Sequence, residues 1–134
     1  MKLKNFIPAF FLFVIGILVA AGPFSFAHVC EAGEKLMKCH WSARVEFFLG
    51  LELALLALLR CFSKSGAFSL GIDAGIFLAA VGIVLVPTIL IGVCGNVSMH
   101  CHSVTKPFLL VAGCLGALVA LADVLLGLGA KRRR

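Results

Sequence analysis

The sequence predicts an all-α membrane protein whose four transmembrane helices form two parallel helix–loop–helix repeats, related by a pseudo-twofold axis along the membrane normal. Three observations predict this class: the composition, four apolar runs of membrane-spanning length, and a motif that occurs twice. Of the 134 residues, 62% are hydrophobic and 13% are charged, and the mean hydropathy is +1.14. Soluble domains carry about 25% charged residues. A chain this short cannot bury so much apolar surface within itself, so the bilayer is expected to cover part of it.

The four apolar runs extend from Phe6 to about Phe26, Val45 to Leu59, Ala67 to Val93, and Pro107 to Ala130. A helix needs about 20 residues to cross a hydrocarbon core of about 30 Å. The second run is the shortest. Together the runs predict one membrane domain over residues 1–134, with the first repeat at 1–62, the second at 67–130 and a basic tail at 131–134.

The first run also has the features of a signal peptide. Met1–Lys4 is basic, the apolar stretch follows it, and Ser25-Phe26-Ala27 fits a small-x-small cleavage site. Removal of residues 1–27 is therefore the alternative interpretation. The internal repeat described below favours an uncleaved helix, because the first run is the counterpart of the third.

Basic residues flank the apolar runs unevenly, and this predicts the orientation. With both termini in the cytoplasm, eight basic residues lie inside and four lie outside, which satisfies the positive-inside rule. The inner set is Lys2, Lys4, Arg60, Lys64, Lys131, Arg132, Arg133 and Arg134, and the outer set is Lys35, Lys38, Arg44 and Lys106. The net charge of +6 thus indicates a multi-pass cell (inner) membrane protein in contact with lipid, and no nucleic-acid partner is expected.

The two predicted outer loops share a motif. In each loop a proline is followed by a cysteine seven positions later, and then by Met-x-Cys-His. The first copy comprises Pro23, Cys30, Met37, Cys39 and His40, and the second comprises Pro87, Cys94, Met99, Cys101 and His102. Both copies lie between a rising and a returning helix, so the repeat is parallel.

The chain resembles the small membrane proteins grouped as domain-of-unknown-function family 4418. The resemblance is carried by Cys30, Met37-Lys38-Cys39-His40-Trp41, Pro87-Thr88, Leu90-Ile91-Gly92-Val93-Cys94, Met99, Cys101 and Pro107. It covers almost the whole chain. The resemblance implies a four-helix membrane protein and assigns no reaction, so the function has to be inferred from the residues.

Thioether, thiolate and imidazole groups together are soft metal ligands. They suit copper(I) best and zinc next, and haem iron is a further candidate. The predicted extracytoplasmic metal site comprises Cys30, Met37, Cys39, His40, Cys94, Met99, Cys101 and His102. Four short helices with few polar groups make a poor transport path, so we expect the protein to act with a larger membrane transporter.

The same cysteines allow two other functions. Outside the membrane, Cys30 with Cys39 and Cys94 with Cys101 could form loop-pinning disulfides in a structural subunit of a permease. Reversible oxidation would instead make the protein a membrane thiol–disulfide oxidoreductase. The sequence contains no Cys-x-x-Cys, which disfavours this enzyme, and no Cys-x-x-Cys-His for covalent haem attachment.

Residues inside the apolar runs yield further hypotheses. Glu52 is a candidate intramembrane proton or ion site, since acids in this environment are costly. Pro23 and Pro87 are expected to kink their helices beneath the two motifs. Gly71, Gly75, Gly113 and Gly116 are expected to let helices pack closely, within the chain or in a homo-oligomer.

Overall fold

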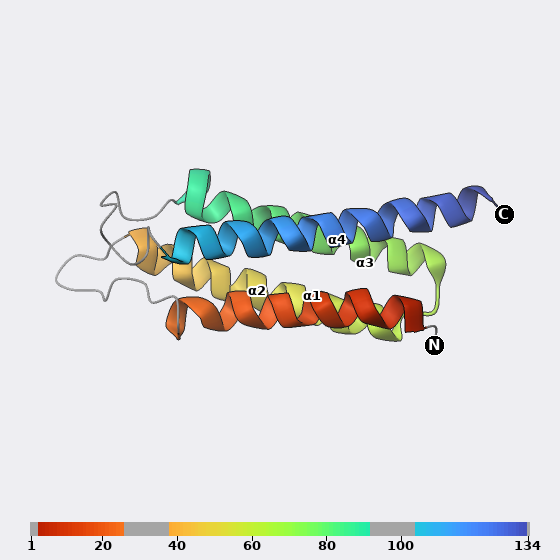
Figure 1. The fold of residues 1–134 in the computed structure, drawn as a ribbon, viewed down its shortest axis with the longest axis horizontal. Coiled ribbons are helices and arrows are strands. Elements are labelled where there is room, and N and C mark those ends of the chain that lie inside the picture. Colours follow the sequence, from red (N-terminus) through yellow and green to blue (C-terminus); the bar gives the residue numbers. More distant parts are fainter. Residues whose placement is uncertain (1–2, 26–37, 92–103, 134) are drawn as a thin grey trace.

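A computed structural model describes residues 3–25, 38–91 and 104–133, which form four long helices (Figure 1). In chain order these are α1 (Leu3–Ala21), α2 (Lys38–Phe62), α3 (Gly66–Leu85) and α4 (Lys106–Arg132). A 3₁₀ turn, η1 (Gly22–Phe24), follows α1, and a π-helical turn, η2 (Val86–Leu90), follows α3. The predicted all-α class with four helices is therefore confirmed.

The helices run along the long axis of the molecule as an antiparallel bundle (Figure 1). α1 packs mainly against α2, and α3 packs against both α2 and α4. We call the end that holds Phe24, Lys38, Leu90 and Lys106 the loop end, because both long interhelical connections start and finish there. The opposite end, with the two termini and the short turn between α2 and α3, is the terminal end.

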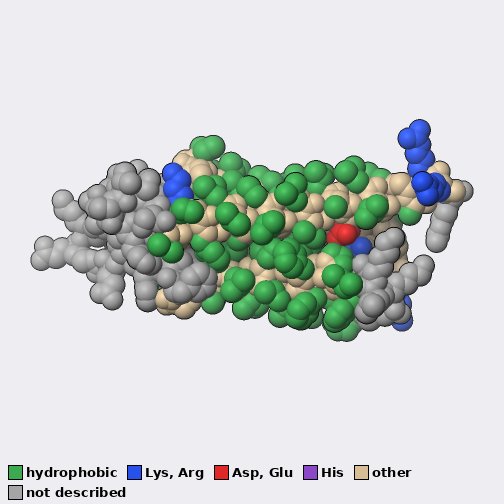
Figure 2. All heavy atoms as spheres, in the orientation of Figure 1, with side chains coloured by type: hydrophobic (Ala, Val, Ile, Leu, Met, Phe, Trp, Pro, Cys, Tyr) green, Lys and Arg blue, Asp and Glu red, His purple; other side chains and the backbone are tan. Residues whose placement is uncertain are grey.

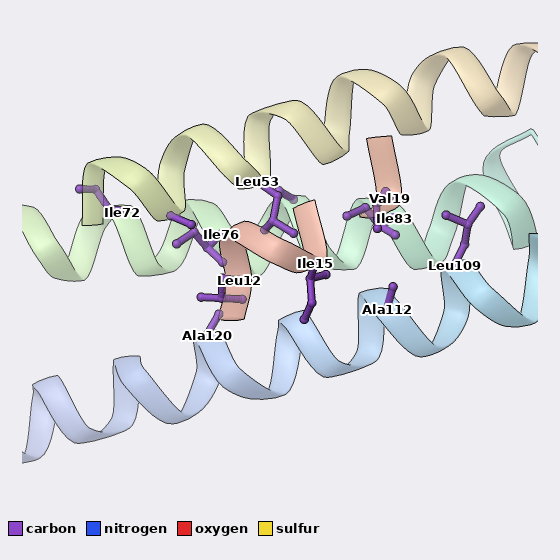
Figure 3. Packing of buried hydrophobic residues seen from close by; sticks show 12 residues of the cluster. Leu12, Ile15, Val19, Leu53, Ile72, Ile76, Ile83, Leu109, Ala112 and Ala120 are labelled. Carbon is purple, nitrogen blue, oxygen red and sulfur yellow. The ribbon is translucent and has the colours of Figure 1, made fainter. Parts of the chain in front are cut away.

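All four helices contribute to one apolar core (Figure 3). The inward residues recur every three or four positions, the spacing that keeps side chains on one helix face. They are Leu12, Ile15 and Val19 of α1, Leu53 and Ala57 of α2, Ile72, Ile76, Ala79 and Ile83 of α3, and Leu109, Ala112 and Ala120 of α4. Because α1 supplies three of these side chains, the bundle is incomplete without it.

The outward faces of the helices are also apolar. Phe10, Phe48, Leu78 and Leu118 are between 57% and 69% exposed, and Figure 2 shows hydrophobic side chains covering the middle of the molecule. Two helices are long and apolar enough to cross a membrane: Gly66–Leu90, which joins α3 to η2, and Lys106–Arg132. Only 39% and 28% of their most apolar windows are buried, whereas the core helix of a soluble protein would be mostly buried.

The closest approach between helix backbones joins α1 to α2. A Cβ added to Gly50 would lie 2.5 Å from the backbone nitrogen of Ala20, and one added to Gly16 would lie 2.6 Å from that of Ala54. Each helix thus offers a small-xxx-small pair to the other, the pattern that lets helices pack closely in lipid. Sequence analysis did not identify Gly16 or Gly50 as packing residues.

The glycines that sequence analysis named for packing have different surroundings. A Cβ at Gly113 would meet Val84 at 2.5 Å and the carbonyl oxygen of Ala80 at 3.0 Å, so α4 approaches α3 closely there. Gly75 and Gly116 have room for a Cβ at ordinary contact distance, and nothing lies within 4 Å of one at Gly71. Within this single chain, therefore, Gly113 requires the absence of a side chain and Gly71 does not.

Candidate functional site

Most of the candidate metal ligands fall outside the described residues. Cys30, Met37, Cys94, Met99, Cys101 and His102 fall outside the described ranges, and of Cys39 and His40 only the helical backbone is described. Elsewhere in the described ranges, no group of three His, Cys, Asp or Glu residues is placed to hold a metal ion. The proposed metal site thus stays a prediction from sequence.

The two motif copies meet their following helices differently. α2 begins at Lys38, so Cys39 and His40 belong to its first turn, whereas α4 begins at Lys106, four residues after His102. The backbone of Cys39 and His40 thus belongs to α2, whereas the described part of the chain resumes at Val104, beyond the second motif.

The loop end contains a buried carboxyl group that sequence analysis did not select. Glu46 of α2 is 0% exposed, and in the described part of the chain neither Oε1 nor Oε2 has a hydrogen-bond partner. Ser42, one helical turn nearer the loop end on the same face, is also buried, and so is Thr105, just before α4. Buried polar groups are normally paired, so an unpaired carboxyl group marks a candidate site.

Helix-to-helix contacts fix the depth of Glu46. Leu49 of α2 lies 3.4 Å from the Cβ position of Gly82 in α3. The two helices are antiparallel. Three residues nearer the loop end, Glu46 of α2 is therefore level with Leu85, the last residue of α3 before η2.

The contact with α1 gives the same depth from the other side. Gly50 meets Ala20, so moving four residues toward the loop end brings Glu46 level with Phe24 in η1. The rings of Phe24 and Phe47 have centroids 6.1 Å apart, which agrees with this register. Glu46 therefore lies where α1 and α3 both depart from α-helical geometry.

The departure in α3 follows from its sequence. Pro87 has no N–H, so the α-helical hydrogen-bond pattern cannot continue through it. The chain instead forms a π turn, in which the N–H of Ile91 donates to the carbonyl oxygen of Val86 at 3.1 Å. The hydroxyl of Thr88 donates to the carbonyl oxygen of Val84 at 2.8 Å and caps a helix carbonyl there.

An open recess of about 410 Å³ lies at the same depth on the outer side of α2. Its lining is formed by Phe24, Arg44, Phe47 and Phe48, and Arg44 is exposed. Arg44 points outward while Glu46, two residues later, is buried. The positive charge of Arg44 therefore does not neutralise the carboxyl group in the core.

The terminal end holds the other buried acid, and there the charge is paired. Arg60 Nε of α2 donates to Asp73 Oδ1 of α3 at 2.8 Å, and the two side chains are 12% and 3% exposed. Asp123 of α4, half-buried, is within electrostatic range of both. The Arg60–Asp73 ion pair thus joins α2 to α3 at this end of the bundle.

Glu52, the acid that sequence analysis selected, lies on the exposed face of α2. A signal for Glu46 was present in the sequence. Glu46 follows Ala43 and precedes Gly50 and Ala57 at helical spacing, and a stripe of small residues is the face that packs against other membrane helices. Glu52 shares its face with Phe48, Leu55 and Leu59, all of them exposed.

The observations above define a class: a small antiparallel four-helix protein with an apolar exterior and a buried glutamate that has no hydrogen-bond partner among the described residues. The family described as Domain of unknown function (DUF4418) matches residues 12–126, and the chain belongs to this family. The family resemblance expected from sequence is thereby confirmed. No curated protein and no solved structure matches the chain.

Proposed function

We propose that this protein crosses the inner membrane four times and binds a soft metal ion through the Cys/Met/His motifs of its two outer loops. Both termini would lie in the cytoplasm, and the bound ion would pass to a membrane transporter. The observation that carries the proposal is the convergence of four helix ends, those of η1, α2, η2 and α4, at the loop end (Figure 1). Both motifs are connected to these helix ends, which supports a site shared by the two loops.

The apolar exterior supports the membrane part of the proposal. Exposed large hydrophobic side chains occur on all four helices, including Phe6 and Phe11 near one end and Leu90 near the other. In water, a protein partner would have to cover these surfaces over most of the molecule. In a bilayer, lipid covers them. Trp41, in the first turn of α2 and 51% exposed, would lie at the membrane interface, where tryptophan is common.

The metal part is tested by measuring bound copper and zinc on the whole chain, purified under reducing and oxidising conditions. We expect stoichiometric metal in the reduced protein and its loss when Met37, Cys39, Met99 and Cys101 are replaced together. Cys61→Ser and Cys114→Ser are matched controls, because these two thiols are free and lie outside the motifs. Absence of metal in every redox state, with the four loop cysteines in stable disulfides, would overturn the proposal in favour of a structural subunit.

The oxidoreductase alternative makes a different prediction for the same cysteines. It requires a mixed disulfide with a substrate to accumulate when Cys39 or Cys101 remains and its partner cysteine is changed to serine. Non-reducing electrophoresis followed by mass spectrometry would detect this species. Its accumulation, together with absence of bound metal, would replace metal binding by thiol exchange as the function of the loop end.

A further inference from the structure

The recess on the outer side of α2 has an aromatic lining that two elements build together. Phe24 comes from η1, whereas Phe47 and Phe48 come from α2. The ring of Phe47 meets the ring of Phe24 edge to face, with centroids 6.1 Å apart, and it meets the ring of Phe48 in the same way at 5.8 Å. Such contacts are favourable between aromatic rings. The three rings therefore form one connected apolar surface beside a space of about 410 Å³.

Local hydrogen bonds at the end of α1 fix the position of Phe24. The hydroxyl of Ser25 donates to the carbonyl oxygen of Ala21 at 2.9 Å, and the N–H of Ser25 donates to the carbonyl oxygen of Gly22 at 3.1 Å. These bonds satisfy carbonyl groups that the end of a helix leaves open. The turn η1 is thereby held against the end of α1, and the side of the recess that Phe24 forms is part of the fold.

Arg44 adds a positive charge to this apolar surface. Among the described residues that line the recess, it alone is charged, and it is exposed. In the described ranges its guanidinium group forms no ion pair. A guanidinium group binds phosphate through parallel N–H donors, and it does so most strongly where water is scarce. The recess therefore combines a phosphate-binding group with a surface that suits a hydrocarbon chain.

The outward face of α2 presents its side chains in the order of the groups of a phospholipid. Trp41, Arg44, Phe48, Leu51 and Leu55 follow one another at three- and four-residue spacing, which keeps them on one helix face, and all are exposed. From the loop end toward the middle of the helix, this face offers an aromatic ring, a cation and then apolar side chains. A phospholipid whose headgroup lies at the loop end offers a polar headgroup, a phosphate and then acyl chains.

From this arrangement we infer that the recess binds one phospholipid of the outer leaflet that has an anionic headgroup, with its phosphate on Arg44 and an acyl chain against the phenylalanine rings. The inference rests on the membrane-crossing part of the proposed function and adds a specific lipid partner to it. Arg44 follows Lys38, the first residue of α2, by about 9 Å along the helix axis, so its long side chain reaches the level of the headgroups. A headgroup with an amine neutralises its own phosphate, so the unpaired arginine favours a lipid such as phosphatidylglycerol.

The test uses Trp41 as a reporter, because it is the single tryptophan of the chain and the chain has no tyrosine. The whole chain is reconstituted in phosphatidylcholine vesicles in which a fraction of the lipid carries bromine atoms in the upper part of its acyl chains. Bromine quenches the fluorescence of a nearby tryptophan. At equal mole fraction, brominated phosphatidylglycerol should occupy the site about fivefold more readily than brominated phosphatidylcholine, because a basic residue near the membrane surface attracts anionic lipid.

Two pairs of variants test the two parts of the recess. Arg44→Gln should abolish the preference for phosphatidylglycerol, whereas Lys106→Gln, which removes a charge from α4 at the same end of the bundle, should leave it unchanged. Phe48→Ala should weaken the preference, whereas Phe68→Ala, which removes a similarly exposed ring from α3, should not. Far-UV circular dichroism that matches the wild type shows that each variant is folded. A preference that survives in Arg44→Gln would overturn the inference.

The outcomes also separate a specific site from general attraction to the membrane surface. An equal loss of preference in Arg44→Gln and Lys106→Gln would assign the effect to the charge of the whole loop end and overturn the lipid site. Equal quenching by the two brominated lipids in the wild type would also remove the lipid site, while the membrane-crossing part of the proposed function would stand. Absence of quenching by either lipid would overturn both, because Trp41 would then lie outside the bilayer.

Discussion

The two ends of this bundle place a buried carboxyl group in opposite surroundings. At the terminal end, Asp73 is 2% exposed and receives a hydrogen-bonded guanidinium from the neighbouring helix. At the loop end, Glu46 is equally buried and has no partner in the described part of the chain. One carboxyl group therefore holds helices together, whereas the other costs stability. A group that costs stability and is nevertheless present is the better candidate for function.

The largest effect is expected from breaking the pair at the terminal end. Arg60→Ala leaves Asp73 buried without its counter-charge, which should lower the free energy of unfolding by about 3–5 kcal/mol. Unfolding by a denaturing detergent in mixed micelles would measure this difference. Lys64→Ala, which removes an exposed charge from the adjacent turn, should leave the stability unchanged within about 0.5 kcal/mol. Equal stability of the two variants would show that the ion pair contributes nothing.

The second largest effect on stability is expected from the contact between α1 and α2 beside Glu46. Gly50 is one turn from Glu46, and its added Cβ would collide with the backbone of Ala20. Gly50→Ala should therefore destabilise the protein by about 1–3 kcal/mol, the usual cost of overpacking.

Gly71→Ala is the matched control for this contact. It should be neutral or stabilising by up to about 1 kcal/mol, because space is open there and alanine favours helix. The same unfolding assay applies. A Gly50→Ala protein as stable as the wild type would mean that α1 and α2 are not in this close contact.

At the loop end, replacing the buried acid should raise the stability instead of lowering it. Glu46→Leu replaces an unpaired buried carboxyl group by an apolar side chain of similar size, so the metal-free protein should gain about 1–3 kcal/mol of stability. Glu52→Leu, on the exposed face, provides the comparison and should change stability much less. Destabilisation by Glu46→Leu would indicate that Glu46 has a stabilising partner and that the two ends do not differ in the way described.

The smallest effect should come from the third member of the terminal-end cluster. Asp123 is half-buried and shares the arginine with Asp73, so its removal relieves repulsion between two carboxylates and also loses attraction to Arg60. Asp123→Asn should change the free energy of unfolding by less than about 1 kcal/mol, in contrast to Arg60→Ala. An effect as large as that of Arg60→Ala would show that all three residues contribute to stability, and not only the Arg60–Asp73 pair.

The sequence predicted the helices, whereas most of the predicted metal ligands fall outside the described residues. Apolar runs are visible because a membrane helix needs a continuous length of them, and α1, α3 and α4 occupy most of the runs that began at Phe6, Ala67 and Pro107. α2 is longer than its run of 45–59, because the helix continues through polar residues that a search for apolarity does not count.

The depth of each acid could not be read from hydropathy alone. Glu46 lies at the edge of the apolar run and Glu52 in its middle, so hydropathy favours Glu52 as the deeper residue. Depth along the membrane normal and burial within the bundle are different quantities, and the second depends on helix rotation. Rotation follows from where the small residues are, since these face the neighbouring helices. The pairing of Arg60 with Asp73 depends on the register between α2 and α3, which no single-helix pattern encodes.

The tight contact of Gly16 and Gly50 with the opposite helix has a consequence for how the protein is made. The first hairpin emerges from the ribosome before α3 exists, and helices that are neighbours in the chain can associate once both are inserted. The close contacts of Gly16 and Gly50 join α1 to α2 only, so they involve no residue of the later half. Arg60 can form its ion pair only after the second hairpin is made, because its partner Asp73 belongs to α3. The ion pair would then stabilise the association of two halves that assemble in succession.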